Sequence, residues 1–381
     1  MQVWMARLWP GVLLCVFCGV LGCAGTYRAE PSAVGLNAPA YDVVALRWQH
    51  RLAHRDVFDY RPQEWASAAI AADGSVYVGS SAQRLLAFQR NGRMRWSFKT
   101  QGAVSSKPLI DGDKIYFGAD DGVLYALDRH SGRKLFAYPT RAPIINQPRT
   151  IGGLVLFTNG ENRVYAIDGQ TGKWRWQYDR EAPEGFTIQG HAGILLHGDL
   201  AYTGFSDGVT VALNARTGAV EWAQRLCSDK KQFVDVDSTP VLIKGLLVSA
   251  CYAGGVYALD PQTGAVRWHV QAESVAHIAA DDQQIFYAAP RAGLVALTTH
   301  GSESWRQALP NGTPTAPVSV GRYVAVSSTR SGLFIARKDN GALVQYFDPG
   351  HGISAPAAVH DETMVLLSNH GRLFAFDIRG N

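Results

Sequence analysis

The sequence has little net charge and no dense run of basic residues. Its 36 Lys and Arg residues stand against 32 Asp and Glu, which leaves a net charge of +4 over 381 residues. Proteins that bind nucleic acid usually carry a concentrated basic surface, so we expect no nucleic-acid partner. The G-x-x-x-x-G-K-[ST] and H-E-x-x-H motifs are missing as well. We therefore predict neither a catalytic site nor a metal site.

Cysteine is scarce. Three of the five cysteines, Cys15, Cys18 and Cys23, fall near the N-terminus, and only Cys227 and Cys251 lie further along the chain. In an exported protein the second pair could form a disulfide, because the compartment is oxidising. Two free buried thiols are the alternative, since a disulfide needs Cα atoms within about 7 Å. The sequence leaves this choice open.

The N-terminal residues are typical of an export signal. Arg7 is the only charged residue before Cys23, and an apolar run from Leu8 to Leu21 follows it. The run is short and lightly flanked for a transmembrane helix, which favours a secretion signal over residues 1–22.

The signal ends in Leu21-Gly22-Cys23-Ala24, which resembles the bacterial lipobox. The resemblance implies that Cys23 becomes the mature N-terminus and carries the lipid. Ala24, rather than Asp, resembles the sorting signal for the outer membrane. The alternative is an ordinary signal peptide in which Cys23 is incidental. We expect residues 23–42 to form a lipidated flexible tether and residues 43–381 to form one folded domain.

One unit recurs through this domain with a period near 40 residues. It reads G-x-apolar-apolar-A-apolar-[D/N]-x-x-[T/S]-G-x-x-x-W, and such a period is typical of propeller blades. Its alanine occurs at Ala87, Ala126, Ala166, Ala212, Ala258, Ala296, Ala336 and Ala375. A turn glycine follows in seven units, and six have an aromatic residue four positions later; Gln345 is the exception. The sequence predicts an all-β fold, an eight-bladed β-propeller with four strands per blade.

The repeat also predicts a role for each recurring residue. We expect the alanine to permit close approach of the sheets near the axis, and the tryptophan to cover the wider gap between blades. The innermost strands are expected often to end in proline, as in Ser106-Lys107-Pro108. The recurrent aspartates are predicted to accept backbone N–H bonds in turns. They are Asp128, Asp168, Asp260 and Asp377.

The eighth unit stops at Asp377, before its tryptophan strand. The segment Arg47-Trp48-Gln49-His50-Arg51-Leu52 matches the missing strand. We predict that this N-terminal strand closes the last blade, which would remove the open sheet edges of the ring.

The repeat resembles that of pyrroloquinoline-quinone dehydrogenases. Those enzymes add a calcium site and a disulfide between adjacent cysteines, and no adjacent cysteines occur here. We predict a protein that is not an enzyme and has no cofactor. A quinone-dependent dehydrogenase or quinone-binding propeller is the alternative.

Two intervals of 46 residues mark insertions, at Asp179 to Ala192 and at Cys227 to Thr239. Alternation in an extended segment places Phe186 and Ile188 on one side of the first. It likewise places Asp235 and Asp237 on one face of the second. We predict a docking patch with an apolar centre and a carboxylate rim. Alternatively, the aspartates cap turns and the apolar pair covers a neighbouring blade.

The lipobox, the eight repeats and these two segments together resemble the BamB family. Phe186-Thr187-Ile188-Gln189-Gly190 matches the family's apolar-Ser/Thr-apolar-Arg-Gly segment. Asp235-Val236-Asp237-Ser238-Thr239-Pro240 matches its Asp-Val-Asp-Thr-Thr-Pro segment.

The resemblance implies that Phe186, Ile188, Asp235 and Asp237 contact a POTRA domain of BamA. Gln189 stands where the family has arginine, so one charged contact is lost. The implied protein is a monomeric scaffold lipoprotein that faces the periplasm, within a complex that inserts outer-membrane proteins. A propeller that serves an unrelated envelope complex is a further alternative, because fold alone does not decide function.

Overall fold

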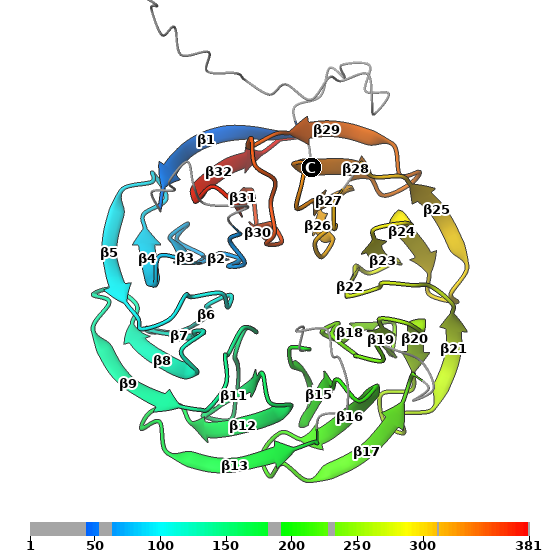
Figure 1. Cartoon of the computed structure of the whole chain (residues 1–381), viewed down its shortest axis with the longest axis horizontal. Helices are drawn as coiled ribbons and strands as arrows, with labels where there is room; N and C mark the ends of the chain where they lie inside the picture. The colour runs from blue at the N-terminus through cyan, green and yellow to red at the C-terminus, as the bar shows by residue number, and fades with distance from the viewer. Residues whose placement is uncertain (1–42, 53–62, 182–191, 228–232, 311, 380–381) are drawn as a thin grey trace, which may run out of the picture.

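The computed structural model describes residues 43–52, 63–181, 192–227, 233–310 and 312–379. These residues form 32 β-strands, arranged as eight four-stranded antiparallel sheets around a common axis (Figure 1). None of the described residues belongs to a helix that could span a membrane. The predicted all-β, eight-bladed propeller is confirmed.

The strands of each blade follow one another from the axis outward, except in the last. Blades 1 to 4 comprise β2 (Ala69–Ile70), β3 (Val76–Ser80), β4 (Arg84–Phe88), β5 (Met94–Lys99); β6 (Leu109–Asp111), β7 (Lys114–Gly118), β8 (Val123–Asp128), β9 (Lys134–Pro139); β10 (Arg149–Ile151), β11 (Leu154–Asn159), β12 (Arg163–Asp168), β13 (Trp174–Asp179); and β14 (Leu195–His197), β15 (Leu200–Gly204), β16 (Val209–Asn214), β17 (Val220–Arg225).

Blades 5 to 8 comprise β18 (Val241–Ile243), β19 (Leu246–Cys251), β20 (Gly255–Leu259), β21 (Val266–Val270); β22 (His277–Ala280), β23 (Gln284–Ala289), β24 (Gly293–Thr298), β25 (Glu303–Gln307); β26 (Val318–Val320), β27 (Tyr323–Ser327), β28 (Leu333–Arg337), β29 (Leu343–Phe347); and β30 (Ala358–His360), β31 (Thr363–Leu367), β32 (Arg372–Ile378), β1 (Val44–Arg51).

The sequence suggested that the innermost strands end in proline, and this prediction was wrong. In blades 2 and 5 the strand begins directly after the proline, at Leu109 after Pro108 and at Val241 after Pro240. Proline has no N–H group to donate to the ladder, so it is tolerated just before the first paired residue.

The recurrent alanine lies on the third strand from the axis, so its expected place near the axis was wrong. Ala212 pairs across the sheet with Trp222 of the outermost strand, and a β-bulge follows in the register. Ala87 and Trp96 repeat the arrangement in blade 1. The small side chain lies opposite the largest, which leaves room for the indole between blades.

Each of these aromatic rings packs against the turn glycine of the next blade. Gly264 has φ +73°, and a Cβ atom there would lie 2.6 Å from Cε3 of Trp222. The same ring donates its Nε1–H to the carbonyl of Pro261 at 2.9 Å. The expected covering of the gap is confirmed. Seven junctions share the contact: Trp48 with Gly92, Trp96 with Gly132, Phe136 with Gly172, Trp176 with Gly218, Trp222 with Gly264, Trp268 with Gly301, and Trp305 with Gly341.

The N-terminal strand closes the last blade, as predicted. β1 pairs antiparallel with β32, from Val44 opposite Ile378 to Arg51 opposite Arg372. At the eighth junction, the N–H of Val44 donates to Oε1 of Gln345, and Nε2 of Gln345 donates to the carbonyl of Val44, both at 2.9 Å. Gln345 therefore binds the backbone of the closing strand where the other units have an aromatic ring.

The recurrent aspartates divide into two groups. Asp168 accepts the backbone N–H groups of Gln170 and Thr171, at 3.0 and 2.8 Å, and Asp128 and Asp260 do the same in their turns. Asp377 instead forms an ion pair with Arg47 of the closing strand, and that guanidinium lowers the pKa of its carboxyl group. The predicted turn role therefore does not apply to Asp377, because the fourth strand of its blade is β1 and no hairpin turn joins β32 to it.

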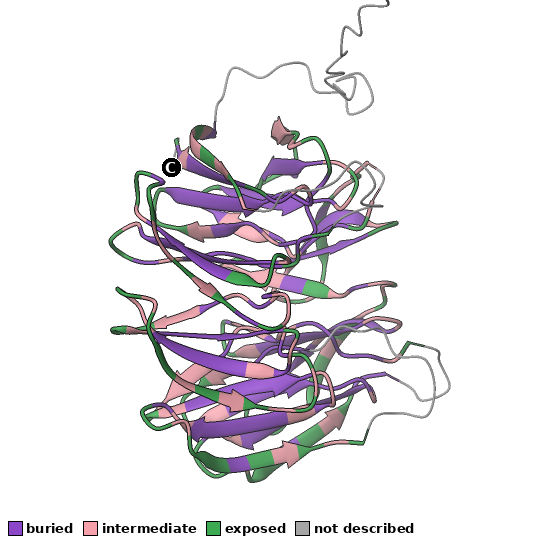
Figure 2. Ribbon diagram, turned by 60° about the vertical axis from the view of Figure 1, so that its left-hand side comes forward, coloured by how far each residue is buried: buried purple, intermediate pink, exposed green. Residues whose placement is uncertain are grey.

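Buried side chains lie mainly on the second and third strands from the axis, the innermost strands are mostly half-buried, and exposed side chains lie in turns and on the outermost strands (Figure 2). The apolar clusters form between neighbouring blades rather than within one. One cluster joins Val78 and Phe88 of blade 1 to Val365 and Leu373 of blade 8. Packing between blades is thus what holds the ring together.

Candidate docking site

The two inserted connections are neighbours in space. The first joins β13 to β14, and the second joins β17 to β18, so they border blade 4 on its two sides. The N–H of Gly193, at the end of the first, donates to Oγ1 of Thr239, at the end of the second, at 2.9 Å. The structure therefore brings the described end of the first connection beside the end of the second.

Four of the predicted site residues lie outside the described part of the chain. They are Cys23, Phe186, Ile188 and Gln189. Their predicted roles as lipid attachment site and partner contacts stay predictions. Asp235 and Asp237 are described, and they lie in the second connection.

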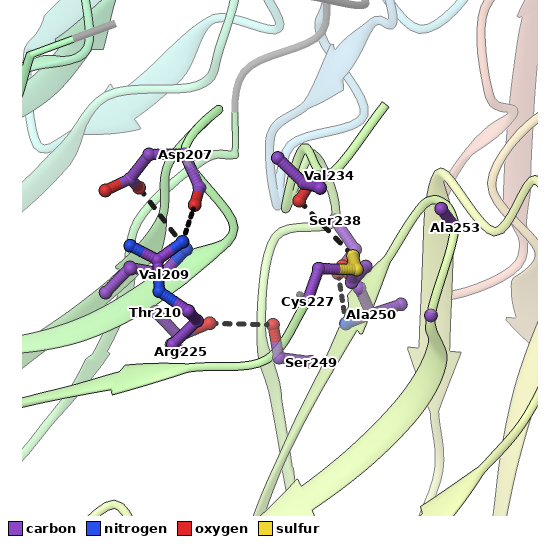
Figure 3. Close-up of a disulfide and its surroundings, with 12 residues drawn as sticks. Asp207, Val209, Thr210, Arg225, Cys227, Val234, Ser238, Ser249, Ala250 and Ala253 are labelled. Carbon is purple, nitrogen blue, oxygen red and sulfur yellow. Dashed lines mark hydrogen bonds between the residues drawn. A yellow bond between two sulfur atoms is a disulfide. The ribbon is translucent and has the colours of Figure 1, made fainter. Parts of the chain in front are cut away.

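A disulfide between Cys227 and Cys251 anchors this second connection to β19 (Figure 3). The two Cα atoms are 6.2 Å apart, so the choice that the sequence left open resolves to a disulfide. Ser238 adds two bonds to β19: its Oγ donates to the carbonyl of Ala250 at 3.2 Å and accepts the Ala250 N–H at 2.8 Å. The segment from Val234 to Thr239 is thereby held tightly although it contains no strand.

Asp235 and Asp237 do not form an exposed rim. Their side chains are buried, with exposed fractions of 1% and 6%. Both carboxylate oxygens of Asp237 lack a hydrogen-bond partner among the described residues, so Asp237 caps no turn there. Burial raises the pKa of Asp237 well above its ordinary value, and the charge of Asp235 raises it further. Asp237 is therefore a carboxyl group kept from water, a costly arrangement for an ionised side chain.

Phe233 is the exposed apolar residue that sequence reasoning missed. It has an exposed fraction of 41% and packs edge-on against Tyr252, with ring centroids 6.3 Å apart. Its φ of +59° lies in the left-handed region, which phenylalanine rarely adopts. The alternation that paired Asp235 with Asp237 also includes Phe233 and could have identified it.

A basic residue borders the first connection. Arg180, directly after β13, pairs with Asp207 of the β15–β16 turn, and Nη1 donates to the hydroxyl of Tyr178 at 3.2 Å. Burial alone would lower the pKa of Arg180, but these hydrogen bonds outweigh it and the pKa is raised. Its charge is therefore already engaged within blades 3 and 4.

The described residues include one open recess away from the two connections. No group of three or more His, Cys, Asp or Glu side chains among them could hold a metal ion. An open recess of about 660 Å³ lies outside the ring, between β1 and the β4–β5 turn. It is lined by Arg47, Arg90, Arg95 and Asp73 among others, and it is remote from the two connections.

Comparison with protein families identifies the chain. A family model described as outer membrane protein assembly factor BamB matches residues 43–143, 124–298 and 252–381. The chain belongs to this family.

Individual relatives agree with the family model. An outer membrane protein assembly factor BamB of Legionella pneumophila is 29% identical over 182 residues, which cover 46% of this chain and 47% of that protein. One of Yersinia pestis is 24% identical over 341 residues, covering 86% and 76%. The chain spans about half the length of the first curated relatives that it matches.

Solved structures share the fold. The crystal structure of BamB from Moraxella catarrhalis superposes with a TM-score of 0.76 at 20% identity, covering 88% of this chain and 100% of that one. A quinohemoprotein alcohol dehydrogenase from Pseudomonas putida has a TM-score of 0.65 at 16% identity, covering 89% and 76%. Both likenesses concern the fold alone.

Proposed function

We propose that the protein is a non-enzymatic scaffold of the outer-membrane β-barrel assembly complex. Its family and the names of its relatives support this role. The lipobox-like Leu21-Gly22-Cys23 supports a lipid anchor on Cys23, with the propeller facing the periplasm as a monomer within the complex.

The docking surface is formed by the two inserted connections, and its partner is a POTRA domain of BamA. The observation that carries this proposal is the Gly193–Thr239 contact, which joins the described ends of the two connections. Phe233 is exposed in the second connection. Phe186, Ile188 and Phe233 supply apolar contact area, and Asp235 and Asp237 lie buried beneath the surface of the second connection. Gln189 replaces a charged contact by a neutral one, so we expect binding to depend more on the apolar residues.

Co-purification from native outer membranes tests this surface. The chain is compared with a Phe186→Ala/Ile188→Ala variant and with an Asp235→Asn/Asp237→Asn variant. Loss of the BamA band by more than about tenfold is expected from the apolar variant, because residues at the centre of an interface carry most of its affinity. Val220→Ala and Val266→Ala, exposed on the outermost strands, serve as controls. Retention of BamA by both site variants would remove these residues from the interface.

A quinone-binding propeller is the second candidate, because quinohemoprotein alcohol dehydrogenases share the fold. Adding pyrroloquinoline quinone with calcium to the purified protein distinguishes the two. The scaffold proposal predicts no perturbed cofactor absorbance and no dye reduction with alcohols. A saturable absorbance change would favour the quinone-binding candidate.

A further inference from the structure

Two basic side chains lie together at the inner edges of blades 2 and 3. Lys107 precedes Pro108 at the start of β6, and Gln147 holds the same position before Pro148 in the next blade. Arg149 is the first residue of β10.

Hydrogen bonds fix this group in place. Nε2 of Gln147 donates to the carbonyl of Pro108, next to Lys107, at 2.9 Å. Nη1 of Arg149 donates to Oε1 of Gln147, and Nε donates to the carbonyl of Ile194 in blade 4, both at 2.9 Å. The Arg149 guanidinium is thus held by two anchors, and its Nη2 makes no hydrogen bond with any described residue.

The charges of Lys107 and Arg149 are not compensated within the described part of the chain. Neither side chain forms an ion pair with a described carboxylate, and the Lys107 ammonium group makes no hydrogen bond there. Enclosure by the surrounding strands lowers the pKa of Lys107, and the charge of Arg149 lowers it further. Enclosure also lowers the pKa of Arg149.

Arginines elsewhere in the ring show the contrast. Arg175 pairs with Asp168, Arg216 with Asp199, and Arg267 with Asp260, although all three arginines are more than half exposed. The three exposed arginines, whose charges water already stabilises, each have a carboxylate partner. The enclosed Lys107 and Arg149 have no carboxylate partner among the described residues. Enclosed like charges without a carboxylate oppose folding, so their retention calls for a ligand.

We propose that Lys107 and Arg149 form a binding site for a small oxyanion, of the phosphate or carboxylate class. An ammonium group and a guanidinium Nη2 would each donate to the anion, in charge-assisted hydrogen bonds. The site is independent of the proposed docking function.

Isothermal titration of the purified protein with sodium phosphate or sodium succinate, at ionic strength held constant with sodium chloride, tests the site. We expect saturable binding of at least one anion. Lys107→Met and Arg149→Met should each weaken it at least about tenfold, because each removes one charge-assisted bond. Lys173→Met, at an exposed turn, should bind like the original chain. No saturable binding, or equal binding by all variants, overturns the proposal.

Thermal melting supplies a second readout. Without anion, Lys107→Met should melt at a higher temperature than the original chain, because the variant removes an uncompensated charge while keeping the side-chain volume. Phosphate should raise the melting temperature of the original chain and leave that of the variant unchanged. A variant that melts lower without anion, with an unchanged response to phosphate, would show that Lys107 is structural and overturn the site.

Discussion

The outer rim of the ring and the two inserted connections follow opposite rules. Along the rim, an aromatic ring meets a turn glycine at seven junctions, and the turn aspartates accept backbone N–H groups. In the second connection, Asp237 is buried without a hydrogen bond among the described residues, and Phe233 is exposed in a left-handed conformation. The rim favours stability, whereas the connection retains features that cost stability, as functional sites often do.

Removing the closing strand should break the rim most completely. Deletion of residues 43–52 eliminates β1, exposes the edge of β32 and removes both Gln345 bonds. We expect loss of the cooperative melting transition and aggregation on size-exclusion chromatography. Deletion of residues 26–40, upstream of β1, is the control and should leave the transition intact. A compact monomer without residues 43–52 would refute closure by this strand.

Gly264→Ala tests a single junction. Gly245 provides a matched control, because its φ of +77° resembles the +73° of Gly264 but open space surrounds it. The left-handed backbone should cost each variant about 1–2 kcal/mol. Overlap with Trp222 should cost Gly264→Ala about a further 1–3 kcal/mol. Chemical denaturation measures both, and equal losses would show that the aromatic contact is not tight.

Asp237→Asn tests whether the buried carboxyl group of the second connection costs stability. The pKa of Asp237 is raised in the folded state, so the folded protein holds its proton at pH values where the unfolded chain has lost it. Stability therefore falls as pH rises from the unfolded pKa toward the folded one, by about 1.4 kcal/mol per pH unit. The asparagine side chain does not titrate, so the free energy of unfolding of the variant does not fall with pH for this reason.

We therefore expect Asp237→Asn to be the more stable protein at pH 7 and no more stable than the original chain at pH 3. Urea unfolding at the two pH values measures the difference. A variant that is less stable at pH 7 would mean that the carboxylate is compensated in the folded state.

The repeat alone predicted the fold, because most units show their register in one alanine, one glycine and one aromatic residue. Closure was also predictable, since Arg47-Trp48 matches the strand missing after Asp377. The position of the alanine within the blade was not predictable, because small residues suit any crowded position. Only the register between strands shows that Ala212 faces Trp222.

The candidate site was predicted less well. Alternation correctly put Asp235 and Asp237 together but gave no information on depth, and the disulfide and the Ser238 bonds hold both below the surface. The Lys107–Arg149 pair was unpredictable, because the two residues are 42 positions apart and only neighbouring blades bring them together. Contacts between repeats depend on geometry that no single repeat contains.

Photo-crosslinking in living cells tests the central claim, that the partner docks on the inserted connections. A photoreactive phenylalanine analogue at position 233 is compared with the same analogue at Met94, which is exposed on the rim. The account predicts a covalent adduct with BamA from position 233 and none from position 94. An adduct from position 94 alone would contradict it.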